Sequence, residues 1–318
     1  MKSNEITKDV SVIIVNYNTK QLLKDCLTSI YEKTDSIDFE VIVSDNGSHD
    51  GSAEMCRECF PQVRLIENNA NLGFGAANNR GLSVATGKYI FYLNSDTVLL
   101  NNAIKIFFDY FESHANENLG AIGCNLKDVN GGGYVHSYGE IIPLKKRLGG
   151  LFHTLLGISK DTLLYIISGF KKQKIVIERS ANFFIGTVPY VTGADLFVRN
   201  DEYAKYDERF FLYSEEVDLQ LTMHNAGLMS KIINGPEIIH LVGASSKKAL
   251  YKIFYIASKH DQELFISWCK FYEKHENKPF QIFLLKIVIM LIWLNPLIVK
   301  DTYKNIPRLF KKSCPTLS

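Results

Sequence analysis

Short apolar strands alternate with helices over the first hundred residues, and this alternation limits the possible folds more than any other feature. Residues 11–15 and 39–43 are β-branched runs, and similar runs follow at 63–66 and 89–93. Apolar residues at helical spacing lie between these runs. The alternation predicts an α/β fold, with a mostly parallel central sheet and helices on both faces. Ligands of such sheets bind at the carboxyl ends of the strands, so the residues that follow each strand form the candidate site.

The same pattern continues to about residue 245. We expect strands at 119–124 and 189–198, a helix at 102–114, and a helix at 215–226 that ends at Gly227. Between residues 143 and 180 the pattern is replaced by mixed apolar and basic residues. The sequence therefore predicts one domain over residues 1–245, in which 143–180 is an insertion, and a C-terminal helical region over 246–318.

The C-terminal region contains an apolar stretch at 282–299 that Lys286, Asn295 and Pro296 interrupt. A helix that spans a membrane needs about 20 apolar residues without a proline break, so we do not expect a crossing. Two alternatives remain open. One is a helix that lies at the membrane surface, favoured by the basic residues that follow it, and the other is a buried helix that packs on the rest of the chain or on a second subunit in a homo-oligomer. The basic residues are Lys300, Lys304, Arg308, Lys311 and Lys312.

Composition excludes several classes of protein. The chain has 36 Lys and Arg against 34 Asp and Glu, a balance that argues against a nucleic acid as the main partner. Its six cysteines are scattered, which is typical of reduced cytoplasmic thiols, and the close pair Cys56 and Cys59 is expected on a helix without metal or redox chemistry. Residues 1–10 are polar and lack the apolar core of a signal peptide, so we expect a cytoplasmic protein.

Polar segments follow the predicted strands. After the first strand stands Asn16-Tyr-Asn-Thr19, where a dinucleotide-binding enzyme would have glycines, and the chain has no P-loop motif. The second strand leads into Asp45-Asn-Gly-Ser-His-Asp-Gly-Ser52, and Asn-Leu-Gly-Phe-Gly follows at 71–75. The fourth strand ends in Asn94-Ser-Asp96, and one carboxylate at the end of an apolar strand suits a divalent cation that faces a diphosphate.

These segments, taken in order, resemble the family 2 inverting glycosyltransferases, especially the rhamnosyltransferase-like bacterial members. The resemblance continues through Val-Thr-Gly-Ala-Asp at 191–195, Phe-Leu-Tyr-Ser-Glu-Glu-Val-Asp at 211–218 and His-Leu-Val-Gly at 240–243, and it covers about residues 11–245. It implies the GT-A fold, which binds nucleotide sugars. It also implies that the donor nucleotide contacts Asn16, Asp45, Asn46, Arg80 and Asn94.

The resemblance further implies a divalent metal ion, Mn²⁺ or Mg²⁺, held by Asp96 and His240. Many relatives have Asp-x-Asp where this chain has Asn94-Ser-Asp96, which leaves one anionic ligand in place of two. A neutral imidazole from His240 would favour Mn²⁺ over Mg²⁺.

An acidic pair, Glu215 and Glu216, occupies the place of the family's catalytic carboxylates. Glu216 is the candidate base that takes the proton of the acceptor hydroxyl, at a position where relatives often have aspartate. The extra methylene changes the reach of the carboxylate, so the assignment among Glu215, Glu216 and Asp218 stays open. Gly193, Asp195 and Asp218 are expected on the acceptor side.

The sequence therefore predicts an enzyme that moves a sugar, with rhamnose as a candidate, from a dTDP- or UDP-linked donor to a growing bacterial surface glycan. We expect an acceptor carried on a polyprenyl diphosphate and a peripheral place at the inner face of the plasma membrane. Two other functions remain as alternatives. The first is a nucleotidyltransferase, which is disfavoured because such an enzyme would carry a glycine-rich phosphate loop after the first strand. A non-catalytic member that binds nucleotide sugar or serves as a scaffold is suggested by Asn94.

Overall fold

The computed structural model of the chain describes residues 5–167, 182–241, 259–294 and 305–310. Contacts along the chain divide it into two compact units. The first, here called the sheet unit, comprises residues 1–141, 179–208 and 215–247. The second, the helical unit, comprises residues 142–178, 209–214 and 248–318. The boundary predicted at residue 245 stays a prediction, and each unit is described by itself.

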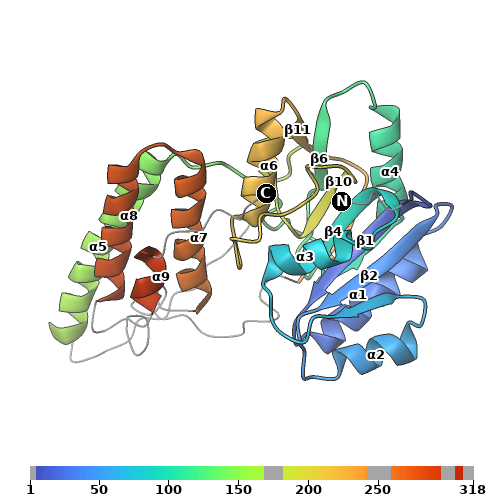
Figure 1. Cartoon of the computed structure of the whole chain (residues 1–318), viewed down its shortest axis with the longest axis horizontal. Coiled ribbons are helices and arrows are strands. Elements are labelled where there is room, and N and C mark those ends of the chain that lie inside the picture. Colours follow the sequence, from blue (N-terminus) through green and yellow to red (C-terminus); the bar gives the residue numbers. More distant parts are fainter. Residues whose placement is uncertain (1–4, 168–181, 242–258, 295–304, 311–318) are drawn as a thin grey trace. The chain divides into compact units, whose positions relative to one another are not determined.

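The sheet unit contains the strands and five of the described helices (Figure 1). Its strands are β1 (Lys8–Asn16), β2 (Phe39–Asp45), β3 (Arg64–Glu67), β4 (Gly87–Asn94), β5 (Thr97–Leu99), β6 (Leu119–Cys124), β7 (Tyr138–Gly139), β8 (Gly186–Val188), β9 (Tyr190–Val191), β10 (Asp195–Arg199), β11 (Met229–Ile233) and β12 (Ile238–His240). Its helices are α1 (Lys20–Lys33), α2 (Ser52–Cys59), α3 (Phe74–Leu82), α4 (Ala103–Ser113) and α6 (Glu215–Asn225).

The main sheet has eight strands in the order β3-β2-β1-β4-β10-β6-β11-β8. β10 is antiparallel to its neighbours β4 and β6, β8 is antiparallel to β11, and the other six strands run in one direction. The predicted mostly parallel sheet is thus confirmed. The register sets Asn16 beside Asp45 and Val15 beside Asn94, so the polar ends of three strands meet at one edge.

Helices cover both faces of this sheet, as predicted. Alternate residues of β4 enter different clusters, because side chains of a strand point to opposite faces. Phe91 packs in the cluster that includes residues of α1, α2 and α4, whereas Tyr92 packs in the cluster that includes residues of α6. The close cysteine pair lies on α2, as expected, with Cys56 buried and Cys59 exposed.

The single strand expected at 189–198 is wrong. The structure has two short strands there, β9 and β10, separated by a loop, and Pro189, which has no amide hydrogen to continue a ladder, separates β9 from β8. β8 pairs with β11, β9 pairs with β7, and β10 enters the main sheet between β4 and β6. The residues between β9 and β10, 192–194, are thereby left as a loop at the strand ends.

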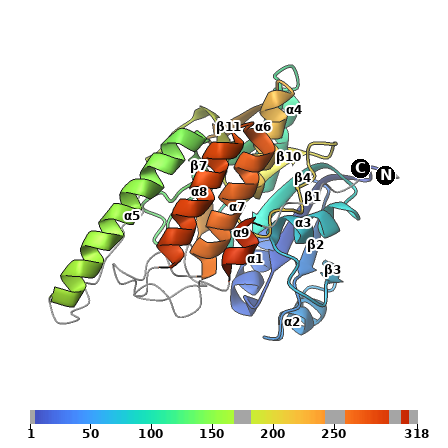
Figure 2. The same cartoon turned by 60° about the vertical axis from the view of Figure 1, so that its left-hand side comes forward.

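The helical unit contains α5 (Leu144–Ile167), α7 (Lys259–His275), α8 (Pro279–Trp293) and α9 (Ile306–Phe310). α5, from the segment predicted as an insertion, packs along α8 (Figure 2). Among the described residues no helix has both the length and the apolar composition that a membrane crossing requires. Asn295, Pro296 and the basic residues at 300, 304, 311 and 312 lie outside the described residues, as do residues 171–172 and 242–243.

Candidate active site

A buried polar pair stands where β1 and β2 end. The amide Nδ2 of Asn16 donates to Asp45 Oδ1 at 2.8 Å and to Ser48 Oγ at 3.0 Å. Ser48 donates in turn to Asp45, through its hydroxyl to Oδ1 at 2.6 Å and through its backbone N–H to Oδ2 at 2.9 Å. Three donors therefore fix the Asp45 carboxylate as an oriented acceptor at the edge of the sheet.

Two hydroxyls that the sequence analysis did not single out extend this pair toward β4. Thr19 Oγ1 donates to Asn16 Oδ1 at 2.6 Å and lies 3.1 Å from Ser95 Oγ. Ser95 directly precedes Asp96. A chain of hydrogen bonds thus runs from the end of β2, across the end of β1, to the turn after β4.

Asn46 holds the neighbouring loop in place. Its Nδ2 donates to the carbonyl oxygen of Gly73 at 3.0 Å, and its Oδ1 accepts from Asn68 at 3.1 Å. The side chain is buried. This arrangement favours a structural role for Asn46 over the predicted contact with the donor nucleotide, since its amide is engaged within the protein.

Asp96 and His240 are brought together by the small sheet of β5 and β12. His240 pairs with Thr97 across this sheet, and the N–H of Leu241 donates to the carbonyl oxygen of Asp96 at 2.9 Å. The Oδ1 atom of Asp96 lies 3.2 Å from Nε2 of His240. Residues 144 positions apart in the chain therefore form one pair, at the end of the strand where the sequence predicts a metal site.

The geometry of this pair fits two ligands of one divalent cation. Two bonds of about 2.1 Å at a right angle place their ligand atoms about 3.0 Å apart. Nε2 of His240 is thus the nitrogen that faces Asp96, while Nδ1 is buried without a hydrogen-bond partner in the part of the chain that the structure describes. No group of three or more His, Cys, Asp or Glu side chains suited to a metal occurs among the residues that the structure describes. Phosphate oxygens of a ligand would have to complete the coordination of the cation, as is usual for Mg²⁺ in enzymes that bind phosphate substrates.

The acidic pair opens α6. Glu215, Glu216 and Asp218 lie in its first turn, where the helix dipole favours negative charge. Burial opposes this effect and raises the pKa of Glu216 above the ordinary value of a carboxyl group. Tyr213 and Ser214, just before the helix, both have positive φ, at 69° and 67°. Such backbone is costly for residues other than glycine and is concentrated at functional sites.

Glycines let three segments meet beside these carboxylates. A Cβ atom on Gly193 would lie 3.3 Å from the ring of Phe74 and 3.8 Å from Cβ of Glu216. Likewise, a Cβ atom on Gly75 would lie 3.7 Å from Cβ of Glu215. The start of α3, the loop before β10 and the start of α6 are therefore packed together, and Gly193 lies close to the acidic pair.

Asp195 is fully buried in the sheet. Its Oδ2 accepts from the backbone N–H of Cys124 at 2.7 Å, while Oδ1 has no hydrogen-bond partner among the described residues. Burial raises the pKa of Asp195 to about 7, although the backbone hydrogen bond and the nearby His240 lower it in part. A carboxyl group with no exposed surface cannot touch an acceptor, so this geometry does not favour the predicted acceptor contact.

Three predicted site residues remain: Asn94, Asp218 and Arg80. The backbone N–H of Asn94 donates to the carbonyl oxygen of Ala194 at 3.0 Å, which sets Asn94 beside the Gly193 loop. Asp218 is buried in the first turn of α6. Arg80 is exposed near the end of α3, about 9 Å along the helix from Phe74. No hydrogen bond or ion pair within the described residues joins the Arg80 side chain to this site, so its donor contact stays a prediction.

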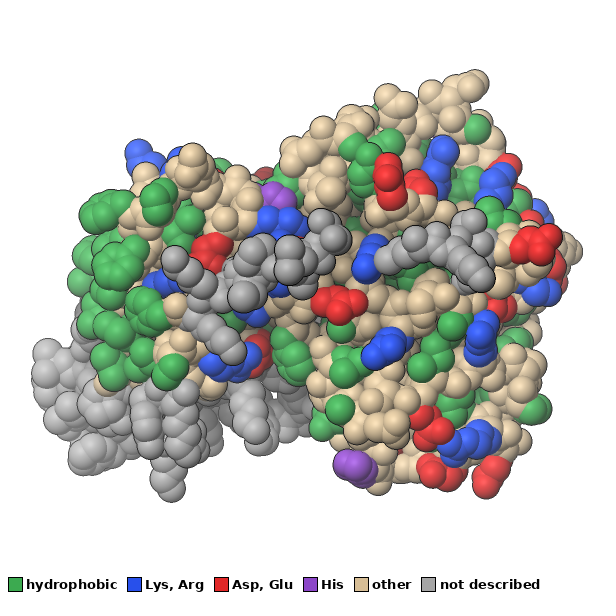
Figure 3. Space-filling view, in the orientation of Figure 1, with side chains coloured by type: hydrophobic (Ala, Val, Ile, Leu, Met, Phe, Trp, Pro, Cys, Tyr) green, Lys and Arg blue, Asp and Glu red, His purple; other side chains and the backbone are tan. Residues whose placement is uncertain are grey.

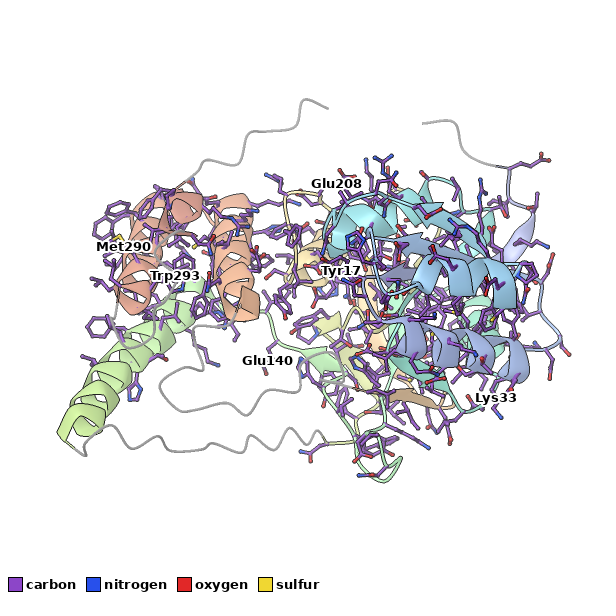
Figure 4. The ribbon with its side chains drawn as sticks, turned by 90° about the horizontal axis from the view of Figure 1, so that it is seen from below. Tyr17, Lys33, Glu140, Glu208, Met290 and Trp293 are labelled. Carbon is purple, nitrogen blue, oxygen red and sulfur yellow. The ribbon has the colours of Figure 1, made fainter. Side chains whose placement is uncertain are left out.

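Tyr17 is a further candidate that the sequence analysis did not select. It directly follows β1 and is about half exposed (Figure 4). The neighbouring backbone N–H of Asn18 is held by Ser48 Oγ at 2.9 Å. An exposed aromatic ring on a fixed loop beside Asp45 offers a stacking surface for a flat ligand.

Comparisons with known proteins identify the family and the fold of the chain. A model of the family described as glycosyl transferase family 2 matches residues 11–175. An N-acetylglucosaminyl-diphospho-decaprenol L-rhamnosyltransferase of Mycobacterium tuberculosis is 25% identical over 249 residues, which cover 74% of this chain and 76% of the relative. An uncharacterized glycosyltransferase of Escherichia coli, YibD, is 39% identical over 93 residues, 28% of this chain and 26% of the relative.

Two solved structures share the fold. GalNAc-T7 with UDP, GalNAc and Mn²⁺ has a TM-score of 0.54 at 15% identity, over 85% of this chain and 48% of that one, so the chain spans about half of its length. The mannosyltransferase PcManGT of Pyrobaculum calidifontis, solved with GDP-Man and Mn²⁺, has a TM-score of 0.50 at 16% identity, over 99% of this chain and 81% of that one. The predicted GT-A fold is therefore confirmed. Since the family model covers more than half of the sequence, the chain belongs to glycosyl transferase family 2 and is a glycosyltransferase.

Proposed function

We propose that this enzyme transfers a sugar, with rhamnose as the first candidate, from a dTDP- or UDP-linked donor to a growing cell-surface glycan, with inversion at the anomeric carbon. The acceptor would be carried on a polyprenyl diphosphate. The relative from Mycobacterium tuberculosis, which matches over three quarters of its length, supports this choice of donor sugar and acceptor. The observation that carries the proposal is the convergence of Asn16–Asp45, Asp96–His240 and the Glu215–Glu216 pair at one edge of the sheet.

The donor nucleotide would lie over the ends of β1 and β2. Uracil and thymine each carry one imide N–H between two carbonyl groups, and the fixed Asp45 carboxylate is a suitable acceptor for that hydrogen. Tyr17 would stack on the base. Thr19 and Ser95 would hold Asn16 and the turn that carries Asp96 in fixed positions relative to each other, so that both can contact the donor.

Asp96 and His240 would hold the divalent cation. When bound, the cation offsets the charge of the nucleoside diphosphate as it departs. Its imidazole ligand favours Mn²⁺. The neutral Asn94, beside the Gly193 loop, would face the donor without adding a second charge.

Glu216 would act as the general base. A carboxylate whose pKa is raised by burial accepts a proton from a hydroxyl more readily, and the acceptor oxygen must lose its proton as it attacks the anomeric carbon. Gly193 keeps the space beside Glu216 open. Glu215 and Asp218 share the same helical turn and remain the alternatives for this role.

The test compares Glu216→Gln with Glu215→Gln, Asp218→Asn and a control, Glu54→Gln, at an exposed position on α2. We expect Glu216→Gln to lower kcat by about 10²- to 10⁴-fold while donor affinity is kept. The control should retain full activity. Full transfer by Glu216→Gln would assign the base to another carboxylate.

Donor choice and metal dependence are tested by the thermal stability of the purified protein with UDP-, dTDP- and GDP-sugars, each with Mn²⁺, Mg²⁺ or EDTA. A ligand that binds only the folded state raises its apparent stability. We expect the largest rise with a dTDP- or UDP-sugar and Mn²⁺, and its loss with EDTA. Stabilisation by a donor that no acceptor panel converts into product would instead support the non-catalytic reading.

The proposed acceptor implies a peripheral place at the inner face of the plasma membrane. Polyprenyl diphosphates are confined to a bilayer by their apolar chains, while nucleotide sugars are soluble. An enzyme that joins the two must work at the surface where they meet.

A further inference from the structure

The outer face of α8 is formed entirely by apolar side chains. Seven residues spaced three or four apart form one stripe about 120° wide along the whole helix. The five most exposed are Phe280, Phe283, Leu284, Leu291 and Leu294, and Ile287 and Met290 lie between them, partly exposed. This set is here called the α8 stripe. Lys286, the one charged residue of α8, lies outside the stripe, nearly buried and ion-paired with Glu273 at 2.5 Å.

Packing within the helical unit uses little of the α8 stripe: Phe283 meets the ring of Phe310 on α9 edge to face, with centroids 6.4 Å apart, and is still 54% exposed. The opposite side of the helix, with Leu285, Ile289 and Trp293, has no exposed surface and packs with α5, α7 and α9. Figure 4 labels both sides, with Trp293 among the helices and Met290 toward the outside. Figure 3 shows hydrophobic side chains gathered over the part of the molecule where Figure 1 draws α8. Contiguous exposed apolar surface of this kind marks an interaction site.

Charge is divided unequally between the two units. The helical unit contains 20 Lys and Arg against 7 Asp and Glu, a formal charge of +13, whereas the sheet unit contains 16 against 27, a formal charge of −11. Several of the basic residues are exposed close to the apolar helices in the chain, among them Lys145 and Lys146 at the start of α5 and Lys278 just before α8. Such a combination of apolar face and basic surroundings is typical of helices that bind anionic bilayers.

A bilayer explains the stripe better than a second copy of the chain. Two units of +13 would repel each other on approach, whereas an anionic surface attracts each of them. The length of α8, 15 residues or about 22 Å, is too short for a hydrocarbon core of about 30 Å, so the helix would lie in the plane of the surface.

We propose that the α8 stripe is a membrane-docking surface, which inserts into the boundary between headgroups and acyl chains of an anionic phospholipid bilayer. The exposed side chains of Lys145, Lys146 and Lys278 would face the phosphate headgroups. This inference deepens the proposed function, because it names the surface by which the enzyme would reach a lipid-linked acceptor. Docking needs neither donor nor acceptor, so it is tested separately from transfer.

The experiment is sedimentation of the full chain with vesicles of phosphatidylglycerol and phosphatidylethanolamine, compared with vesicles of phosphatidylcholine alone. We expect binding to the anionic vesicles at least tenfold tighter than to the neutral ones, and weaker binding in about 1 M salt. The variant is the double change Phe280→Ser and Phe283→Ser, at side chains that are 75% and 54% exposed. It should lower the partition coefficient by about 10- to 100-fold, because two phenylalanines no longer insert.

The matched control is Val129→Ser with Phe183→Ser, which removes apolar side chains that are 66% and 50% exposed on the sheet unit. This control should bind vesicles as the unchanged chain does. Equal binding by Phe280→Ser/Phe283→Ser, or no binding of the unchanged chain, overturns the proposal. The proposal is also overturned if light scattering shows a dimer that the double change dissociates, since this result would assign the α8 stripe to a second copy. The double change should leave the transfer of sugar to a soluble acceptor intact. If neither the unchanged chain nor any variant transfers sugar, that result contradicts the proposed function and not the docking surface.

Discussion

Replacing Asp195 by asparagine should make the stability of the protein depend less on pH. The carboxyl group of Asp195 is fully buried, one oxygen accepts from the N–H of Cys124, and burial raises its pKa to about 7. Asparagine has the same shape, keeps an oxygen for the Cys124 N–H and cannot ionise. The substitution therefore removes one titration and little else.

The sign follows from proton binding. An aspartate in the unfolded chain has a pKa of about 3.9, so between about pH 4 and pH 7 the folded state holds a proton that the unfolded state has released. Stability is then highest below the unfolded pKa and falls by about 1.4 kcal/mol for each pH unit up to about pH 7. The full loss is about 4 kcal/mol. The advantage of Asp195→Asn over the unchanged chain should grow by about 2 kcal/mol between pH 5.5 and pH 8.

The assay is urea unfolding of both proteins at these two pH values, in EDTA so that a bound cation does not change the charge near His240. The difference between the proteins cancels the titration of all other groups. Asp25→Asn, at an exposed position on α1, is the control for the loss of a carboxylate that is not buried. A pH-independent difference for Asp195→Asn, or a variant that is less stable at pH 8, would refute the reasoning.

Two further outcomes follow from the packing around the site. Tyr92 and Tyr206 pack with ring centroids 4.9 Å apart. The Tyr92 hydroxyl donates to the carbonyl oxygen of Ala204 at 2.7 Å, whereas the buried hydroxyl of Tyr206 has no partner within the described ranges. Thermal unfolding should show Tyr92→Phe destabilised by about 1–3 kcal/mol and Tyr206→Phe unchanged or slightly more stable. Gly193→Ala should lower kcat by about tenfold or more with little change in stability, since its Cβ would lie 3.3 Å from the ring of Phe74 and so shift the loop that packs beside Glu216.

The sequence predicts those parts of the fold and site that depend on strand pattern. Runs such as 89–93 are apolar on both faces, which requires helices on both sides of the sheet, and the polar residues that follow them must meet at one edge. The pairing of Asp96 with His240 came from the order of family motifs. The structure supplies the physical cause, a two-stranded sheet of β5 and β12 that joins distant segments.

Other features depend on contacts that a single sequence does not reveal. Thr19 and Ser95 are ordinary loop residues until their loops meet at 3.1 Å. Asn46 has the residue type of a ligand contact, but its amide is engaged by the loop at 68–73. The strand expected at 189–198 is divided at residues 192–194, because pairing of β9 with β7 and of β10 with β4 and β6 overrides the apolar run.

The opposite net charges of the two units also depend on contacts that a single sequence does not reveal. A net charge of +2 suggests a protein without a preferred anionic partner, since the segments that carry the positive charge, 142–178 and 248–318, are separated by part of the sheet unit. Once folding groups them, the two units respond in opposite senses to an anionic surface. The helical unit, at +13, is attracted and the sheet unit, at −11, is repelled. Salt weakens both effects but leaves the insertion of the α8 stripe, and the residual binding at high salt therefore measures the apolar contribution alone.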